Sequence, residues 1–348
     1  MSFGLSTDSL QWSNHFVQQI GLLDEFKGAW NVQRQSATID VAGLKKKMLL
    51  DSAGASFRLS GKKLDQDEVG AFFENPSAVQ DREEARWIWG LRDLFLYVES
   101  EAPNLEINEE LLFDLQLRFC YYLPTSVTGE LGYKQSESVW KVGGRVLAES
   151  VPAQYVAQEM KTLLSWYETE RQRYVLHPIL LSGMFSALFM AIQPFEKGNE
   201  HVARALRELI LLQAGYDHLR LASLERVLEG RQRPYLDAAS MTVRSVLEGS
   251  PDWTPWLQCY LGALTEQLQA IKISMDEQDR RTAVPPLAKT ILEFAQKRRS
   301  FKMAELETFT KESRSTLLYH IQRLVKSGDL VRRGSGKGTF YGPRQSKF

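Results

Sequence analysis

The residues from Ile192 to Arg204, IQPFEKGNEHVAR, have the types and spacing of a phosphate-binding loop. Pro194 stops the apolar run before it, and the Gly-Asn pair in its middle favours a tight turn. Such a turn points backbone N–H groups and the positive end of the following helix at one spot, which suits phosphate binding. The residues predicted to bind there are Lys197, Gly198, Asn199 and Arg204.

Two helices are expected to position this loop. The stretch from Pro178 to Ile192 is apolar on nearly every helical face, which predicts a helix that is buried all round. Val202 to Ala214 resumes a helical pattern and stops at Gly215, a common signal for the end of a helix. The loop is therefore expected to join two core helices.

The loop and its helices resemble the Fic family, whose enzymes mostly transfer AMP from ATP to a protein hydroxyl. The family motif is His-Pro-Phe-x-Asp/Glu-Gly-Asn-Gly-Arg-x-x-Arg. The residues that match it are Pro194, Phe195, Gly198, Asn199 and Arg204. The residues that replace its His, its metal-binding acid, its second Gly and its first Arg are Gln193, Lys197, Glu200 and His201. The resemblance implies a mainly α fold with a Fic-type helical core and a bound ATP.

These replacements predict a catalytically impaired protein. Gln193 cannot accept a proton at neutral pH, and losing a general base costs about 10² to 10⁴ in rate. Lys197 repels Mg²⁺, so the sequence argues against a metal site, although the adjacent Glu196 offers a substitute ligand. His201 offers a substitute base, but the helix is expected to place it elsewhere, at an exposed position. An active adenylyltransferase with an altered motif is the alternative.

Two of the matching residues also have simpler interpretations. Arg204 has the spacing of a surface partner for Glu208 one turn along the same helix. Asn199 is also a residue that commonly caps a helix N-terminus. Neither interpretation needs a ligand.

A β-hairpin is predicted between Thr125 and Val151, where four glycines flank the alternating strand from Ser138 to Val142. It resembles the Fic flap, in which a Gly-x-x-Arg segment precedes Val-Trp-Ile-Gly-Gly. In that family the flap aligns a target polypeptide by strand addition, so the resemblance implies a protein target here. A peptide-binding module without nucleotide is a second alternative. The flap residues are Lys134, Val139 and Trp140.

The segment ASFRLSGKKL, from Ala55 to Leu64, resembles the inhibitory helix of many Fic proteins. In those proteins the Glu of Ser/Thr-x-x-x-Glu-Gly/Asn pairs with the second motif Arg and blocks productive ATP binding. Ser56 and Gly61 match, but Ser60 stands where the Glu belongs. The inhibitory ion pair cannot form through a serine, which agrees with a lost activity. Without the resemblance, these residues predict a polar turn between two helices.

The C-terminal end is basic, although the whole chain is neutral. From Pro285 to Phe348 there are 14 Lys and Arg against 5 Asp and Glu, a net charge of +9. Three helical patterns (287–296, 303–309 and 313–327) precede two strand patterns joined by glycines, which resembles a winged helix. The third helix of such a unit enters the major groove, and the basic charge favours DNA over protein contact. The residues predicted to contact DNA are Lys311, Arg314, Ser315, Thr316, Tyr319, Arg332, Arg333 and Lys337.

The length of 348 residues and the hydrophobic content of 43% allow two or three domains with a large core. The expected parts are an N-terminal helical region (1–110), a Fic-like core (111–275), a linker (276–286) and the winged helix (287–348). A homodimer formed by the body is a further expectation. The two cysteines have no metal-ligand spacing.

We expect a cytoplasmic protein without a membrane span. The first residues, Met1 to Phe16, lack the pattern of a signal peptide. The uncharged run from Tyr174 to Phe195 has the length of a span, but His177-Pro178 and two serines interrupt it. The interruptions leave a shorter helix that suits a protein core.

Overall fold

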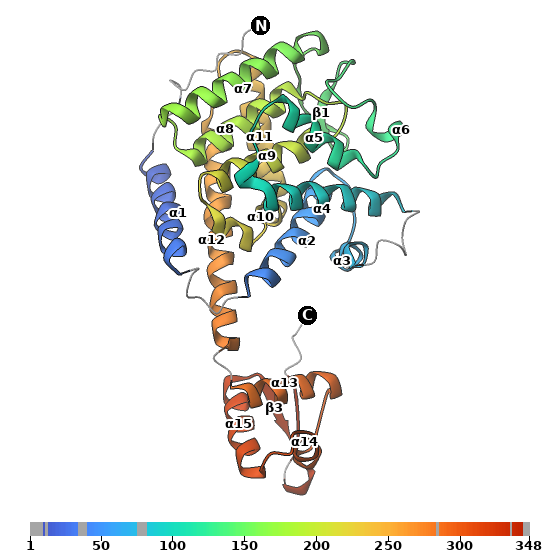
Figure 1. Cartoon of the computed structure of the whole chain (residues 1–348), viewed down its shortest axis with the longest axis vertical. Helices are drawn as coiled ribbons and strands as arrows, with labels where there is room; N and C mark the ends of the chain where they lie inside the picture. Colours follow the sequence, from blue (N-terminus) through green and yellow to red (C-terminus); the bar gives the residue numbers. More distant parts are fainter. Residues whose placement is uncertain are drawn as a thin grey trace. The chain divides into compact units, whose positions relative to one another are not determined.

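The computed structural model describes residues 10, 13–33, 40–74, 82–282, 285–334 and 336–343. It divides into two compact units, Met1–Ile273 and Ser274–Phe348 (Figure 1). In the described ranges, strands form only two antiparallel hairpins, one in each unit, and helices make up most of the rest. The predicted mainly α fold with a short hairpin is therefore confirmed.

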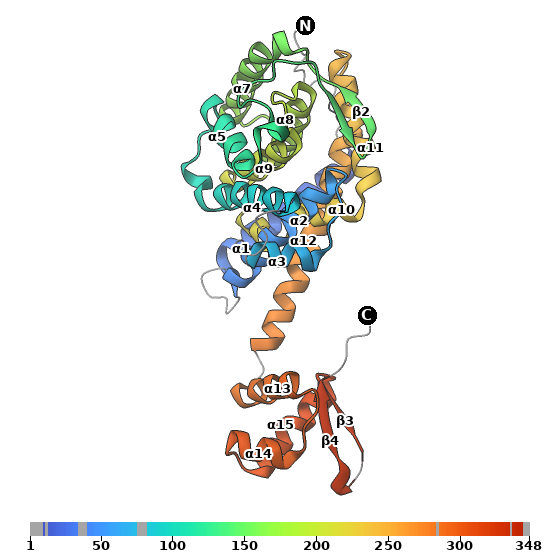
Figure 2. The ribbon, with the colours of Figure 1, turned by 90° about the vertical axis from the view of Figure 1, so that its right-hand side faces the viewer.

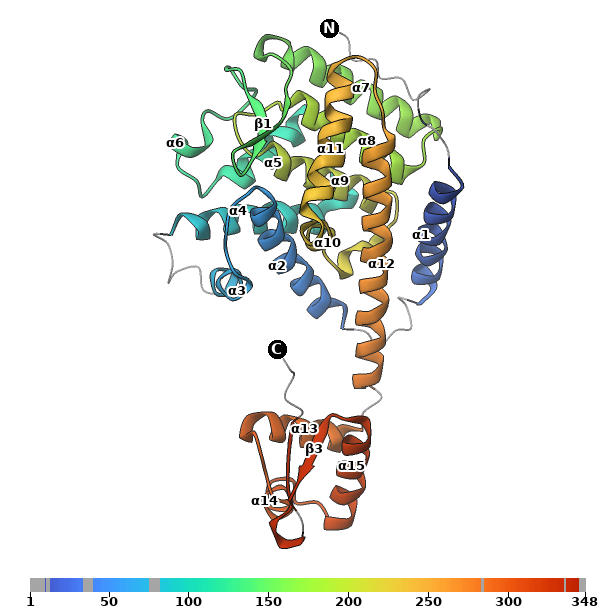
Figure 3. The ribbon, with the colours of Figure 1, turned by 180° about the vertical axis from the view of Figure 1, so that it is seen from behind.

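Helix α8 (Pro178–Ile192) is the centre of the N-terminal unit. Every residue from Ile179 to Ile192 is buried, because α8 packs against α7 (Val156–Arg173), α9 (Asn199–Gln213) and α11 (Gln232–Leu247). Figures 1 and 3 show α8 and α9 side by side inside the ring of other helices. The predicted all-buried helix has the predicted bounds. None of the described helices is long and apolar enough to cross a membrane.

The N-terminal helices belong to the same core as α8 and α9. Helix α4 (Glu83–Glu101) packs against α9, and α2 (Val41–Leu59) packs against α4 and α10 (Leu224–Gly230). The described residues of 1–110 thus lie in the same compact unit as residues 111–273. Its remaining helices are α1 (Asn14–Gln33), α3 (Gln66–Glu74), α5 (Glu109–Cys120), α6 (Thr125–Thr128), η2 (Ala102–Asn104), η3 (Ala153–Tyr155) and η4 (Asp217–Leu221).

The last helix of this region, α12 (Thr254–Thr282), continues into the stretch expected to be a linker. Residues 276–282 are helical, and the division between the two units falls at Ile273. Charged residues such as those of this stretch are compatible with a solvated helix as well as with a loop, which is why composition alone did not distinguish the two.

The predicted flap hairpin consists of β1 (Val139–Val142) and β2 (Arg145–Glu149). The strands are antiparallel, with Trp140 opposite Ala148 and an irregular register before Lys141. Strand β2 rests on α11, because the carbonyl oxygen of Leu147 accepts a hydrogen bond from Nε of Arg244 at 2.6 Å. The helical core therefore supports one side of the hairpin.

The C-terminal unit has three helices followed by a hairpin, in the predicted order. Figure 2 shows its two strands side by side next to the helices. Phe301 forms a one-residue bridge to Tyr341 and thereby ties the segment after the first helix to the hairpin. The elements are α13 (Pro286–Arg298), α14 (Met303–Thr310), α15 (Arg314–Ser327), β3 (Leu330–Arg333), η5 (Gly336–Gly338) and β4 (Phe340–Pro343). Its identification as a winged helix stays a prediction.

Candidate ligand site at the α8–α9 loop

The loop between α8 and α9 is fixed by its own side chains. Gln193 ends α8 in the left-handed conformation, with φ 46°. Gly198 precedes α9 with φ 87°, and a Cβ atom there would lie 2.6 Å from Cδ1 of Phe119, so only glycine fits. The Asn199 amide closes the loop, since Oδ1 accepts from Phe195 N at 2.9 Å and Nδ2 donates to Phe195 O at 2.8 Å. Asn199 therefore braces the loop and does not cap α9.

Glu196 holds the loop to the segment that precedes the flap. Its carboxylate accepts hydrogen bonds from Gln135 N at 3.0 Å and from Ser136 N at 3.2 Å. Burial raises the pKa of this carboxyl, but the hydrogen bonds outweigh that effect, so its pKa lies below the usual value. Glu196 is thus already engaged in a structural role.

The described residues do not fit a Mg²⁺ site. Lys197, in place of the family's acid, is exposed and carries the wrong charge for a metal ligand. Glu196 is bound to Gln135 and Ser136, and the described part of the chain contains no group of three or more His, Cys, Asp or Glu residues that could hold a metal ion. The substitution of Glu196 for the missing acid is therefore not supported by the geometry.

Arg204 is buried and contacts helix α2. Only 3% of its surface is exposed, and Nη1 donates to Ser56 Oγ at 2.8 Å and to the Ser56 carbonyl at 3.3 Å. The interpretation of Arg204 as a surface partner of Glu208 is wrong, because the guanidinium points toward α2. The inhibitory-like segment thus lies against Arg204, although through Ser56 and not through the position of the missing Glu.

The segment around Ser56 is helical up to Leu59, so its interpretation as a polar turn is wrong for these residues. The turn is limited to Ser60 and Gly61, which follow the helix. The Ser60 hydroxyl donates to the Phe57 carbonyl at 2.7 Å and therefore takes no part in holding Arg204.

His201 is fully buried, and the expectation of an exposed histidine is wrong. Its Nδ1 lies 2.9 Å from Ser56 Oγ and 3.3 Å from Arg204 Nη1. Because a guanidinium only donates hydrogen bonds, Nδ1 must accept, and the proton of the neutral ring is on Nε2. Burial lowers the pKa of His201 to about 4. Its acceptor nitrogen is already used, so this arrangement gives no substitute base.

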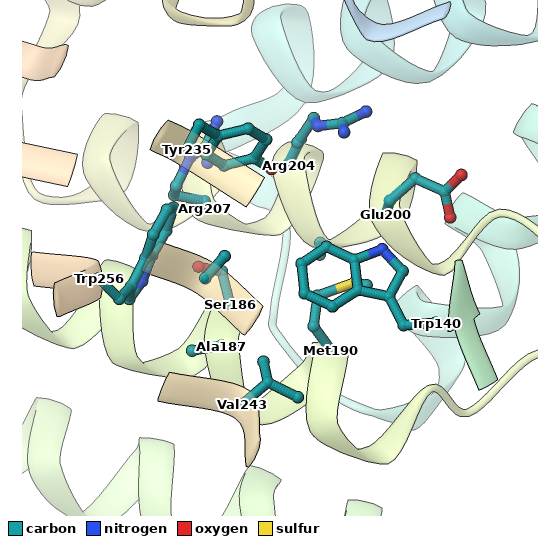
Figure 4. A pocket seen from close by; sticks show the side chains of 12 residues that line it. Trp140, Ser186, Ala187, Met190, Glu200, Arg204, Arg207, Tyr235, Val243 and Trp256 are labelled. Carbon is teal, nitrogen blue, oxygen red and sulfur yellow. The ribbon is translucent and has the colours of Figure 1, made fainter. Parts of the chain in front are cut away.

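A small pocket lies beside the loop, between the flap and the core helices. Figure 4 shows Trp140 pointing inward from β1, with Glu200 and Arg204 on one side and Tyr235 and Trp256 across the pocket. Its free volume of about 20 Å³ suits a water molecule and not a nucleotide. A larger ligand therefore does not fit between the residues that line the pocket as they lie in this structure.

Four buried N–H donors around the loop have no hydrogen-bond partner among the described residues: Trp140 Nε1, Gln193 Nε2, His201 Nε2 and Arg204 Nε. Buried donors are rarely left without an acceptor, so each such group requires an explanation. A ligand rich in acceptor atoms, such as a phosphate compound, would satisfy these donors. The Glu200 carboxylate also lines the pocket and opposes an anion there, so anion binding by the loop stays a prediction.

The predicted flap residues differ in how they are placed. Val139 is half-buried at the start of β1, whereas Trp140 is only 5% exposed and lines the pocket. Lys134 is buried, and its Nζ donates to Ser138 Oγ at 2.9 Å and to Ser150 Oγ at 2.7 Å. Burial lowers the pKa of Lys134. This lysine joins the two ends of the hairpin, a role that no local sequence signal indicated, and contact with a target polypeptide stays a prediction.

The predicted DNA-contacting residues gather on α15, β3 and the residues before α15. Arg314 Nη1 lies 3.3 Å from Glu307 Oε1, and the Tyr319 hydroxyl accepts from Arg323 Nη1 at 3.1 Å. Arg323 is a neighbour of this surface that sequence reasoning did not select. The side chain of Lys337 lies outside the described residues. The predicted residues that the structure describes as exposed are Lys311, Arg314, Ser315, Thr316, Tyr319, Arg332 and Arg333.

The chain is similar to three solved structures of Fic proteins. A Fic family protein from Desulfovibrio desulfuricans G20 shares 16% identity over 99% of this chain and 100% of that chain, with a TM-score of 0.66. A Fic domain containing signaling protein from Bacteroides thetaiotaomicron VPI-5482 shares 16% identity over 74% of this chain and 98% of that chain, with a TM-score of 0.58. Fic-1 from C. elegans shares 13% identity over 76% of this chain and 73% of that chain, with a TM-score of 0.58.

No family model matches the chain. At these identities the similarity concerns the course of the backbone and not the chemistry of the loop. The two helices around the loop, the hairpin beside it and the solved structures that match them all agree with the Fic-type helical core expected from the motif. The chain therefore has the fold of Fic proteins.

Proposed function

We propose that this protein is a catalytically impaired Fic-fold protein that acts as a DNA-binding regulator through its C-terminal unit. The observation that carries the proposal is the exposed cationic surface of α15 and β3 within a segment of net charge +9. The N-terminal end of α15 would enter the major groove. Its side chains would contact base edges there, namely Arg314, Ser315, Thr316 and Tyr319. Lys311, Arg332 and Arg333 would contact phosphates.

Duplex DNA is expected to bind the full-length chain with a strong salt dependence. Each phosphate contact contributes about −0.9 to the slope of log K against log salt. Replacing both Arg332 and Arg333 by Ala should therefore reduce the size of the slope by about 2 and weaken binding to all sequences alike. Fluorescence anisotropy with a labelled duplex, measured over a range of salt concentrations, tests this.

A matched control has the same loss of charge on another helix. Lys289 and Lys297 are exposed on α13, which carries none of the residues predicted to contact DNA. Their double replacement by Ala is expected to change the slope much less. Equal effects of the two double variants, or a slope near zero for the natural chain, would contradict the proposal that α15 and β3 form the DNA surface.

The residues of the α8–α9 loop are the reason for proposing that AMP transfer is impaired. Gln193 has no proton-accepting nitrogen, and the described residues around Lys197 do not fit Mg²⁺. His201 is buried with its acceptor nitrogen already used, so the chain offers no described replacement for the lost base. The remaining function proposed for the loop is to sense a nucleotide through Arg204 and the unpartnered donors beside it.

ATP is expected to bind the full-length chain with equal affinity in the presence of Mg²⁺ and of EDTA. Isothermal titration calorimetry measures this, and Arg204→Ala should abolish the binding heat because it removes the cation of the site. Incubation with labelled MgATP and candidate protein substrates should give no covalent label. A label that Arg204→Ala abolishes would instead establish the active adenylyltransferase. No heat under either condition would contradict nucleotide sensing.

A further inference from the structure

A cavity of about 720 Å³ lies in the N-terminal unit, away from the α8–α9 loop. Its lining includes Pro178 at the start of α8, and Ile210 and Ala214 at the end of α9. Because a short loop joins the other ends of these two helices, about 20 Å of helix separates the cavity from the candidate site. The cavity is therefore a second place in the fold, and its volume is in the range of small-molecule sites.

The cavity combines an apolar floor with charged side chains. Leu176, Leu181 and Ile210 line it and are almost fully buried, as parts of the core of this unit. Glu106 and Arg171 also line it, and both are exposed. Ligand sites typically have an apolar lining with a few polar groups that fix the orientation of the ligand. This lining therefore suits a ligand with an apolar body and a charged end.

The cationic side chains of the described lining already have partners. Arg171 donates from Nη2 and Nε to the two carboxylate oxygens of Glu168, at 2.7 and 2.8 Å. The Nζ atom of Lys27 lies 4.4 Å from the centre of the Tyr216 ring, where the face of the ring attracts a cation. Neither cation is thus left for a ligand.

Two carboxylates of the same lining differ in this respect. Glu106 is exposed and Glu170 is half-buried, and within the described ranges neither side chain has a hydrogen-bond or ion-pair partner. The charge that is not balanced inside the cavity is therefore negative. A ligand that complements it carries a positive charge.

Tyr174 also lines the cavity, in a conformation that glycine normally takes. It follows α7 with φ 52° and ψ 30°, in the left-handed region, and 85% of its surface is exposed. A residue with a Cβ atom is strained there, which is why glycine is usual at this position after a helix. Neither burial nor a side-chain hydrogen bond to a described residue accounts for the tyrosine. An aromatic ring beside an unbalanced negative charge is suited to hold a cation.

We propose that this cavity binds an amphipathic organic cation. The apolar body of the ligand fills the cavity, and its charged group meets the carboxylates of Glu106 and Glu170 and the ring of Tyr174. The inference goes beyond the proposed function, because it concerns a cavity at the far ends of α8 and α9 and needs neither DNA nor a nucleotide.

Tryptamine, an amine on an apolar body, is the probe for this site, and indolepropionate is the matched anion with the same body. Titration of the full-length chain by saturation-transfer NMR is expected to give a millimolar or tighter dissociation constant for tryptamine. Indolepropionate should bind about tenfold more weakly, a difference of about 1.4 kcal/mol. Equal affinities for the two compounds, or no binding of tryptamine, would overturn the proposal.

Glu106→Gln/Glu170→Gln tests the location of the charge, because it removes both carboxylates and keeps their size. Tryptamine should bind about fivefold more weakly, as expected for two partly exposed ionic contacts. The matched control is Glu130→Gln/Glu248→Gln, which changes two exposed carboxylates outside the lining and should leave the affinity unaltered. Equal weakening in the two double variants would assign the attraction to the overall charge of the chain and refute a site in this cavity.

Tyr174→Gly separates binding from stability. Because glycine adopts the left-handed conformation without strain, the urea midpoint of the variant should be no lower than that of the natural chain. Its affinity for tryptamine should fall about threefold, the effect of losing an exposed cation–π contact. An unchanged affinity, at any midpoint, would show that the ring does not meet the cation and would contradict this assignment.

Discussion

Arg207→Met is expected to lower the free energy of unfolding by about 3 to 5 kcal/mol. Arg207 Nη2 lies 2.9 Å from Glu225 Oε1, and the two side chains are only 3% and 4% exposed. Removing the arginine leaves Glu225 as a buried charge without its cation, which costs far more than the loss of an exposed pair. Urea denaturation followed by circular dichroism measures the change, provided that the dependence on urea is unaltered.

The double variant Arg207→Met/Glu225→Leu distinguishes the cost of an unpaired buried charge from the cost of lost packing contacts. If the single variant is costly because a charge is stranded, removing both charges should cost less than the sum of the two single changes. Burial and the nearby Glu225 raise the pKa of Glu208, so Glu208 resists ionisation beside this pair. A single-variant loss below about 1 kcal/mol, the range of exposed ion pairs, would contradict this account.

The same pair shows how α2 is held beneath the candidate site. Ser52, one turn before Ser56 on α2, places its Oγ 3.2 Å from Glu225 Oε2 and 2.8 Å from Ser223 Oγ. Helices α2, α9 and α10 are thus joined by buried polar groups, in addition to their apolar packing. Buried polar networks fix relative positions, because a displaced member leaves its partners unsatisfied. The position of Ser56 against Arg204 therefore depends on this network.

Local signals in the sequence were sufficient to predict the elements around the site. The all-apolar run of α8, Pro178 at its start and the glycine at 198 are short-range features, and each acts within its own segment. The hairpin was likewise evident from alternation and glycines, and the structure has it at the predicted place. The fold could therefore be expected from periodicity and motif order together.

The contacts inside the site could not be predicted in the same way. Ser56 and Arg204 are separated by 148 positions, so no local pattern places them together. His201 was expected at the surface because a polar residue on a helix usually faces water. Helix α9 is instead covered by neighbours on most sides, and its buried side chains His201, Arg204 and Arg207 have partners on α2 or α10. Lys134 is buried for the same reason, under hydroxyls from both ends of the flap.

Acidification from about pH 6.5 to about pH 4 is expected to remove about 3 kcal/mol of stability through His201 alone. The ring is fully buried, and burial lowers its pKa from 6.5 to about 4 in the folded protein. Between these values the unfolded chain binds a proton that the folded chain does not, so stability rises with pH across the window and falls on acidification. His218 is also fully buried with its pKa lowered to about 4, and it adds a second proton to the same window.

Urea denaturation of His201→Gln and His218→Gln between pH 4 and 7 separates the two contributions. Each variant should reduce the slope of the unfolding free energy against pH by the amount that corresponds to about one bound proton. The double variant should reduce it by the amount for about two. Glutamine at position 201 keeps an acceptor for Ser56 and Arg204, so its loss of stability at pH 7 should be small compared with the change in slope. If the pH profile of His201→Gln runs parallel to that of the natural chain, His201 has the same pKa in the folded and the unfolded protein. An unshifted pKa would require a ring that is open to water, and the buried Ser56–His201–Arg204 arrangement would then have to differ.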